Sequence, residues 1–371
     1  MSDSIPFPSA GYLAPDLYAL DDLLSPADRQ LRARVRDWVD QRYLPQIADW
    51  NERAEFPLEL AREIAQFGAF GGNIGEFGCA GLSPLQYGLV MQELERGDTG
   101  LRTMASVQGA LAMNAIYLFG SDEQKQRWLP DMAAGLKLGC FGLTEPEHGS
   151  NPAGMTTTAT RTDTGYLLNG RKMWIGLATN ADVAVVWAKV AGEAGVDPTS
   201  SGAVRGFLVE AGTPGFESTL IERKLSMRAA RTCRMSFQNC ALPKTALLPN
   251  SRGLKSPLTC LNHARYGIAW GVLGAASACF DEARRHALSR VQFGRPIAAF
   301  QLVQRKLALM LTELTKAQLL AYRLAQLKAA GQATHVQISV AKRNNVETAL
   351  EIARTAREIL GGVGILGEFQ A

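Results

Sequence analysis

Helical periodicity dominates the first third of the chain. Apolar residues recur at helical spacing, and helix boundary signals flank them. Two segments begin with a capping box that has proline at the first helical position, Ser25-Pro26-Ala27-Asp28 and Ser83-Pro84-Leu85-Gln86. The pattern predicts helices over residues 26–39, 58–67, 84–94 and 122–134. We therefore expect an N-terminal all-helical domain over residues 1–136.

The pattern changes after about Leu136. Short alternating or apolar runs, broken by turn residues, are typical of β-strands. The runs lie at residues 165–170, 183–187, 206–209 and 235–237. Asn169-Gly170 is predicted to be a hairpin turn, because this dipeptide favours the tight turns that join antiparallel strands. We expect a middle antiparallel β domain over residues 137–252.

Long helical segments return after about Leu254. Residues 261–290, 300–330 and 336–360 are predicted helices, and Gly294-Arg295-Pro296 and Gly331-Gln332 separate them. They make a C-terminal helical bundle over residues 253–371, which we expect to be incomplete. The predicted fold class is α+β, in the order helical domain, β domain and helical bundle.

Composition excludes several classes of protein. The 47% hydrophobic and 20% charged residues are ordinary for a globular protein, and 371 residues suggest two or three domains. A net charge of +4, spread along the chain, argues against nucleic-acid or membrane-surface binding. No run of 18 apolar residues and no leader pattern is present, so we expect a cytoplasmic protein, or a mitochondrial one only if a transit peptide has been removed. The six cysteines and four histidines lack metal-ligand spacing, so no metal is expected.

The densest chemical pattern opens the β domain, at Cys140-Phe141-Gly142-Leu143-Thr144-Glu145-Pro146-Glu147-His148-Gly149-Ser150. Its glycines and proline would fix a loop whose backbone N–H groups point outward, as a planar cofactor with acceptor atoms requires. The alternative is an ordinary loop that enters a sheet.

Together with four further segments, this loop resembles the acyl-CoA dehydrogenase family, and within it the glutaryl-CoA dehydrogenases. The resemblance covers nearly the whole chain after about Asp21. Its motifs are Leu143-Thr144-Glu145-Pro146 with Gly149-Ser150-Asn151, Asn169-Gly170-Arg171-Lys172-Met173-Trp174-Ile175, Ala264-Arg265-Tyr266-Gly267, Arg290-Val291-Gln292-Phe293-Gly294 with Gln301, and Leu360-Gly361-Gly362-Val363-Gly364.

The resemblance implies an FAD cofactor and a homotetramer in which a neighbouring subunit completes the flavin site. The implied cofactor-binding residues are Phe141, Gly142, Leu143, Thr144, Gly149, Ser150, Trp174, Ile175, Gly176, Arg290, Phe293, Gln301, Leu360, Gly361 and Gly362. Gly176 departs from the threonine of the family pattern, so no side-chain hydroxyl is available there to meet flavin N5.

The resemblance also implies an acyl-CoA site. Arg102 and Thr103 would hold the distal carboxylate of a dicarboxylic acyl group, with Glu95 nearby. A guanidinium fork suits that task, because a carboxylate in an apolar pocket needs a paired cation. The alternative is a surface arginine at a helix start. The remaining implied substrate-binding residues are Ser150, Leu258, Leu261, Asn262 and Arg265.

The family's catalytic glutamate lies beyond the Gly-Gly-x-Gly turn, and no match to its segment precedes Ala371. Glu368 is the last carboxylate, and we interpret it as structural. We expect the sequence to be a shortened form of a longer protein; the competing hypothesis is that the base was lost in evolution.

The implied function is FAD-dependent oxidative decarboxylation of glutaryl-CoA to crotonyl-CoA, with electron-transfer flavoprotein as the acceptor. Two alternatives stay open. One is a flavoprotein of the same fold that acts on an acyl-CoA without a catalytic base, of lyase or desulfinase type. The other is a non-catalytic CoA-binding scaffold.

Overall fold

The N-terminal third of the chain is helical in the computed structural model, which describes residues 16–192, 195 and 197–367. Its α-helices are α1 (Pro26–Trp38), α2 (Leu44–Arg53), α3 (Ala61–Ala65), α4 (Pro84–Gly97), α5 (Thr99–Ala105), α6 (Asn114–Phe119) and α7 (Asp122–Ala133). Two π-helical segments, η2 (Val39–Tyr43) and η4 (Ser106–Met113), and two 3-10 segments, η1 (Leu20–Leu23) and η3 (Leu58–Leu60), complete the region.

The capping boxes predicted at Ser25 and Ser83 are confirmed. The Ser25 hydroxyl accepts a hydrogen bond from Asp28 N at 3.2 Å, and the Ser83 hydroxyl accepts one from Gln86 N at 3.1 Å. The helix predicted over residues 58–67 is shorter, since it consists of η3 followed by α3. The pattern also missed residues 99–119, because these helices are buried on nearly all sides and lack a polar face.

The middle region is a seven-stranded sheet. Its strands are β1 (Gly139–Gly142), β2 (Thr158–Arg161), β3 (Gly165–Gly176), β4 (Val183–Ala191), β5 (Val204–Glu210), β6 (Phe216–Leu220) and β7 (Thr232–Pro243). The order is β1-β4-β2-β3-β7-β6, and β5 pairs with β4. The sheet is mixed rather than purely antiparallel, because β1 and β2 both pair with β4 in parallel. Short 3-10 turns lie beside it: η5 (Pro152–Gly154), η6 (Ser201–Ala203) and η7 (Lys244–Ala246).

The hairpin turn predicted at Asn169-Gly170 is wrong. Both residues lie inside β3, where the register with β7 shifts between Leu168 and Gly170. Gly170 has a φ of 146°, and a Cβ there would stand 2.5 Å from Thr157 Oγ1, so the glycine serves a close approach within the sheet. The turn into β3 lies earlier, where Thr162 N donates to Gly165 O at 2.9 Å.

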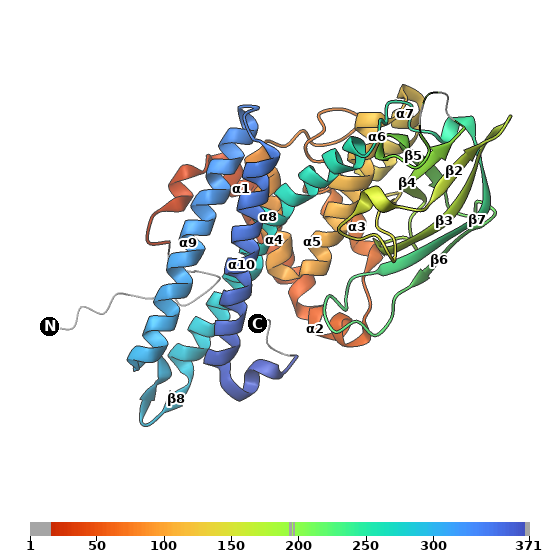
Figure 1. Ribbon diagram of the computed structural model, residues 1–371. Helices are drawn as coiled ribbons and strands as arrows, with labels where there is room; N and C mark the ends of the chain where they lie inside the picture. Colours follow the sequence, from red (N-terminus) through yellow and green to blue (C-terminus); the bar gives the residue numbers. More distant parts are fainter. Residues whose placement is uncertain (1–15, 193–194, 196, 368–371) are drawn as a thin grey trace.

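The C-terminal region is a bundle of three long helices, as predicted. They are α8 (Lys255–Ser289), α9 (Gln301–Ala329) and α10 (His335–Leu360), with the small hairpin β8 (Val291–Gln292) and β9 (Arg295–Pro296) between the first two. The short 3-10 segment η8 (Ile297–Ala299) follows this hairpin. A second one, η9 (Gly361–Ile365), follows α10. Figure 1 shows α8 running from the side of the sheet to the far end of the bundle.

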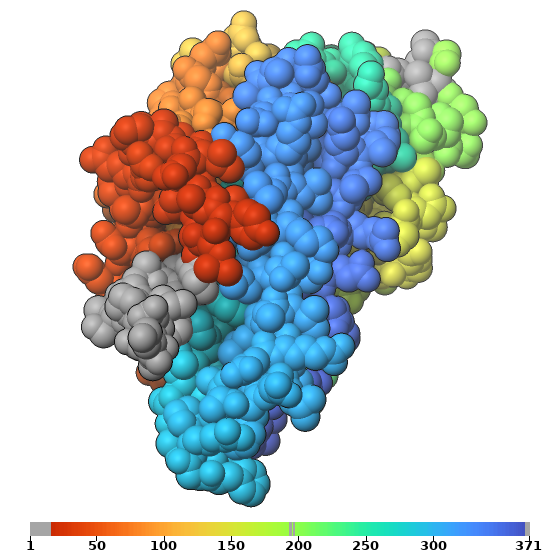
Figure 2. Space-filling model, turned by 90° about the vertical axis from the view of Figure 1, so that its left-hand side faces the viewer, coloured from red at the N-terminus to blue at the C-terminus, as the bar shows by residue number. Residues whose placement is uncertain are grey.

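Helix α8 joins the bundle to the N-terminal helices. It packs along α4 so closely that a Cβ at Gly274 would lie 1.8 Å from Gln92 O. One continuous apolar core joins both helical regions to strand residues such as Phe141 and Val185, and a second core consists of other buried residues of the sheet. Figure 2 shows α9, in light blue, along the face of the bundle that is turned toward the viewer. Leu302 and Leu309 of this helix are exposed. No helix in the described part of the chain is long and apolar enough to cross a lipid bilayer.

Candidate active site

The loop that follows β1 is held by buried polar groups. Lys172 Nζ, on β3, donates to Leu143 O at 3.1 Å and to Glu145 Oε1 at 2.9 Å. Met173 N donates to Thr144 O at 2.9 Å. In the described part of the chain, no hydrogen bond is found for the Thr144 amide or hydroxyl, and the side chain is half-buried. The loop therefore presents free donors on a fixed backbone.

A bulge in β3 turns Trp174 outward beside this loop. Lys172 pairs with Met235 and Ile175 with Cys233, so two residues of β3 oppose one residue of β7. Trp174 has a φ of 64°, and 56% of its surface is exposed, although it is large and apolar. Its neighbour Ile175 is buried. The indole is thus available to stack against a planar ligand.

A cavity of about 500 Å³ lies where α5 and η4 face the end of β3. We call it the interdomain cavity. Thr103, Met104 and Val107 line one wall, and Trp174, Gly176 and Leu177 line another. A Cβ at Gly176 would stand 3.1 Å from Val107 Cγ2, so the glycine widens the cavity at the position where the family pattern has threonine.

Two cations from the segment before β7 line the interdomain cavity, and the sequence patterns did not single out either. Lys224 Nζ donates to Met227 O at 2.8 Å, to Thr232 Oγ1 at 3.2 Å and to Ala230 O, and burial lowers the pKa of this ammonium. Arg231 Nη2 reaches Thr179 Oγ1 at 3.5 Å, while its buried Nε has no partner among the described residues. Neither position belongs to a motif, so only the folded chain reveals them.

Arg102 and Glu95 form a buried ion pair. Arg102 Nε donates to Glu95 Oε2 at 2.7 Å and Nη2 to Oε1 at 3.3 Å, and the two side chains are 8% and 1% exposed. The alternative of a surface arginine is therefore wrong. No hydrogen bond of Nη1 is found among the described residues. Arg102 does not itself line the interdomain cavity, whereas Thr103 does.

The predicted CoA-binding residues of α8 form one half-buried stripe. Leu258, Leu261, Asn262 and Arg265 recur at helical spacing, and Arg265 Nη1 donates to Asn262 Oδ1 at 3.1 Å. Ser150 and Gly149 are exposed in the loop after β1, and Phe141 and Gly142 are buried in β1. The contact of this stripe with CoA therefore stays a prediction.

The remaining predicted flavin residues lie far from that loop in the same chain. Arg290 and Gln301 are exposed, and Phe293 is 93% exposed with a φ of 52°. Leu360 is buried and Gly361 and Gly362 are exposed at the end of α10. Figure 1 shows the β8–β9 hairpin and the end of α10 together at the end of the bundle remote from the sheet. Glu368 lies outside the described residues.

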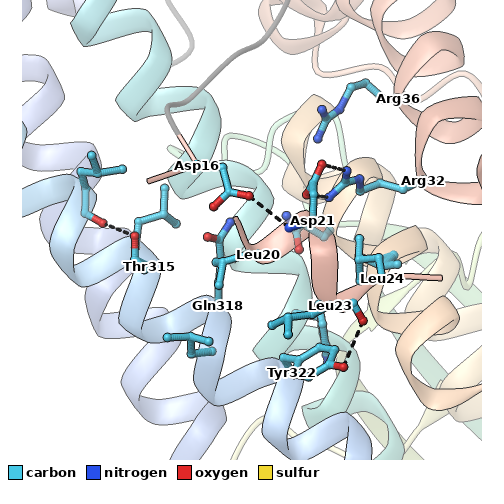
Figure 3. Close-up of a pocket in the computed structure, with 16 residues that line it drawn as sticks. Asp16, Leu20, Asp21, Leu23, Leu24, Arg32, Arg36, Thr315, Gln318 and Tyr322 are labelled. Atoms are coloured by element: carbon cyan, nitrogen blue, oxygen red, sulfur yellow. Dashed lines mark hydrogen bonds and ion pairs between the residues drawn. The ribbon is translucent and has the colours of Figure 1, made fainter. Parts of the chain in front are cut away.

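A second hollow, of about 170 Å³, lies under residues 16–24 (Figure 3) and contains none of the predicted site residues. Residues 21 and 23 of this segment accept hydrogen bonds from two different helices, α1 and α9. Asp21 accepts two hydrogen bonds from Arg32, at 2.7 and 2.6 Å, and Tyr322 on α9 donates to Leu23 O at 3.0 Å. We interpret it as the seam that docks the N-terminal segment onto α9.

Known families and structures match the chain along its length. Residues 25–136, 140–240 and 251–371 match the acyl-CoA dehydrogenase N-terminal, middle and C-terminal domains. An acyl-CoA dehydrogenase of Bacillus subtilis (strain 168) is 35% identical, over 91% of this chain and 89% of the relative. The short-chain specific acyl-CoA dehydrogenase of human mitochondria is 34% identical, over 92% and 82%. The chain belongs to the acyl-CoA dehydrogenase family.

Solved structures of this family that resemble the chain include a glutaryl-CoA dehydrogenase and a butyryl-CoA dehydrogenase. A glutaryl-CoA dehydrogenase of Mycobacterium smegmatis, in complex with FADH2, has a TM-score of 0.91 at 46% identity, over 95% of this chain and 89% of its own. Butyryl-CoA dehydrogenase of Megasphaera elsdenii has a TM-score of 0.87 at 30% identity, over 93% and 91%. The predicted family and fold are thus confirmed.

Proposed function

We propose that this chain is an FAD-dependent acyl-CoA dehydrogenase that oxidatively decarboxylates glutaryl-CoA to crotonyl-CoA. The observation that carries the proposal is the likeness to glutaryl-CoA dehydrogenases of Mycobacterium smegmatis, at 46% and 49% identity over nearly the whole chain. The buried cation Arg102, next to the cavity-lining Thr103, supports the choice of a dicarboxylic acyl group.

The residues present fit an FAD isoalloxazine. The Thr144 amide and hydroxyl, which have no hydrogen-bond partner among the described residues, can donate to its acceptor atoms, and the outward Trp174 can stack beside the ring. FAD supplies the acceptor for the hydride that leaves Cβ of the substrate. The chain's own contribution is to fix these donors and to exclude water with the apolar wall of the interdomain cavity, which includes Met104, Val107 and Leu177.

The reaction balances in two stages. In the first stage, the acyl group loses a proton from Cα and a hydride from Cβ, which leaves a Cα–Cβ double bond. In the second stage, the bond between Cγ and the distal carboxylate breaks, CO₂ departs, and the electron pair moves into the conjugated thioester until Cγ accepts a proton. We assign removal of the α-proton to none of the described residues. We propose electron-transfer flavoprotein as the acceptor of the two electrons.

The acyl specificity follows from Arg102 in this proposal. Its Nε and Nη2 are held by Glu95, so the guanidinium is fixed and Nη1 is left to meet the distal carboxylate. A bidentate partner fixes both the position and the plane of the fork. Thr103 adds a hydroxyl at the cavity wall. A neutral acyl chain of the same length would leave Nη1 without an anion.

The test compares glutaryl-CoA with butyryl-CoA in variants of this pair. Arg102→Ala would leave Glu95 buried without a cation, a cost of about 3–5 kcal/mol that would itself destabilise the fold. The double variant Glu95→Gln/Arg102→Gln removes both charges together. We expect its kcat/KM for glutaryl-CoA to fall at least about 100-fold, while that for butyryl-CoA changes less than about fivefold.

Two controls make the outcome decisive. Arg102→Lys keeps the charge but loses the planar fork, so glutaryl-CoA turnover should fall by an intermediate factor. Bleaching of the flavin absorption by glutaryl-CoA separates a dehydrogenase from a lyase or a CoA-binding scaffold. Equal losses for both substrates in the double variant would show that the Glu95–Arg102 pair is structural and that the glutaryl assignment fails.

A further inference from the structure

The buried Glu145–Lys172 pair lies directly behind the loop that would face the flavin. We propose that Lys172 is a positioning residue that polarises the Thr144 N–H, so that this donor holds the FAD acceptor atoms more tightly in the reduced than in the oxidised cofactor. The inference rests on the proposed FAD binding. It assigns a task to a pair that none of the family's implied contacts requires.

The contacts of Lys172 point to this task. Its side chain is fully buried, and its Nζ donates to Leu143 O at 3.1 Å. That carbonyl belongs to the same peptide group as the Thr144 N–H. A cation bound to the oxygen of an amide draws electron density from its nitrogen and makes the N–H a stronger donor. The N–H thus polarised is one that has no partner in the described part of the chain.

Glu145 holds the ammonium in place. One carboxylate oxygen accepts hydrogen bonds from Thr156 N at 2.7 Å and Thr156 Oγ1 at 2.8 Å. The other accepts from Thr157 N at 3.0 Å, Thr157 Oγ1 at 2.5 Å and Lys172 Nζ at 2.9 Å. The carboxylate therefore accepts five hydrogen bonds, and Lys172 Nζ is held within hydrogen-bond distance of both Glu145 and Leu143 O.

Stability alone does not account for the pair. Buried ion pairs repay their desolvation poorly, and an apolar pair of the same volume is often as stable. A Cβ added at Gly142 would lie 3.5 Å from Lys172 Cγ, so the aliphatic stem packs against β1 and the ammonium emerges at the loop. The arrangement delivers a positive charge to one carbonyl, which a hydrophobic pair could not do.

The test uses the double variant Glu145→Gln/Lys172→Met, which removes both charges and leaves no buried ion unpaired. Apoprotein is titrated with FAD by flavin fluorescence, and the midpoint potential of the bound flavin is measured by dye equilibration. We expect FAD to bind at least about tenfold more weakly, because the hydrogen bond involved is charge-assisted. We also expect a further tenfold loss for reduced over oxidised FAD, equal to about 30 mV for a two-electron couple.

The matched control is Glu93→Gln, which disturbs another buried ion network. Glu93 is fully buried and accepts hydrogen bonds from Arg36 at 2.7 Å and Arg96 at 3.0 Å. It does not line the interdomain cavity, and it is not part of the loop after β1. This variant should lose stability while its FAD affinity and flavin potential stay those of the parent protein. Any loss of FAD in both variants would indicate general destabilisation and overturn the inference.

The single variant Lys172→Arg tests the geometry if the double variant folds poorly. Its charge is retained, but the larger planar head cannot occupy the Nζ position between Leu143 O and Glu145 without displacing the loop. We expect the flavin potential to fall. A parent protein that binds no FAD would refute the proposed function itself, whereas a parent that binds FAD and variants with an unchanged potential would refute only the role of Lys172.

Discussion

Three glycines on α8 allow the Glu95–Arg102 pair to be tested by folding stability alone. Gly267, Gly271 and Gly274 are buried and face α4, but a methyl group would meet different neighbours at each. At Gly267 the added Cβ would lie 3.4 Å from Tyr87 Oη, an ordinary contact. At Gly271 it would lie 2.0 Å from Glu95 Oε2. Glycine to alanine in a helix interior otherwise gains about 1 kcal/mol.

These distances predict stability changes of opposite sign for Gly271→Ala and Gly267→Ala. Glu95 Oε2 would have to retreat about 1.4 Å, from 2.0 to 3.4 Å, and would lose its 2.7 Å hydrogen bond from Arg102 Nε. Separation of a buried pair costs about 3–5 kcal/mol, so the net loss in Gly271→Ala is about 2–4 kcal/mol after the helix gain. Gly267→Ala should instead be stabilised by about 0.5–1 kcal/mol.

Urea unfolding followed by far-UV circular dichroism measures both variants, and Gly274→Ala provides the upper limit. Its Cβ would meet the Gln92 carbonyl oxygen at 1.8 Å, and a backbone atom in a helix cannot move aside as a side chain can. The expected order of stability is Gly267→Ala, parent, Gly271→Ala and Gly274→Ala. If Gly271→Ala proved as stable as Gly267→Ala, the Glu95 carboxylate could not occupy the place assigned to it.

Two further predictions concern pH and assembly. Burial raises the pKa of Glu145, but the Lys172 ammonium and the threonine hydrogen bonds outweigh it and lower the pKa to about 2. Its contribution to folding is therefore complete above the unfolded value of 4.5 and is lost as the pH falls toward 2. The stability difference between parent and Glu145→Gln should accordingly shrink between about pH 5 and pH 2, and a constant difference would contradict the pairing. If a neighbouring subunit completes the flavin site, Arg290→Ala should weaken both FAD affinity and the proposed tetramer in light scattering, and loss of either one alone would refute that coupling.

The sequence predicted the order of the regions because each region has its own periodicity. Helix α1 and α4 begin at capping boxes, and the three bundle helices are long and separated by glycine. Asn169-Gly170 misled because the dipeptide favours a positive φ in a turn and in a bulge alike, and local sequence does not distinguish the two. Strand direction depends on connections across the sheet, so the parallel pairing of β1 with β4 was also out of reach.

The candidate site was predicted where it lies in contiguous motifs and missed where it depends on packing. The loop at Leu143–Thr144 and the Trp174 segment could be named as candidate cofactor-binding segments from the sequence alone. Arg231 and Lys224 could not, because they belong to no motif and enter the interdomain cavity only when their loop folds beside β3. Glu145 and Lys172 are likewise 27 residues apart in the sequence, and they form an ion pair only because β3 lies beside the loop.

The close packing of α4 on α8 bears on the proposed role of Arg102 as a substrate determinant. A Cβ added at Gly88 would meet the Trp270 ring, one at Gly271 would meet Glu95, and one at Gly274 would meet the backbone of α4, so the two helices pack closely along this face. A buried arginine in such a place needs a fixed carboxylate partner to offset its desolvation, and that partner also removes its rotational freedom. In the proposed reaction, Arg102 is buried and oriented before the substrate binds, so the incoming carboxylate would bear most of the desolvation cost, which the departure of CO₂ would relieve. In this proposal, the specificity and the rigidity of the site therefore have the same physical origin.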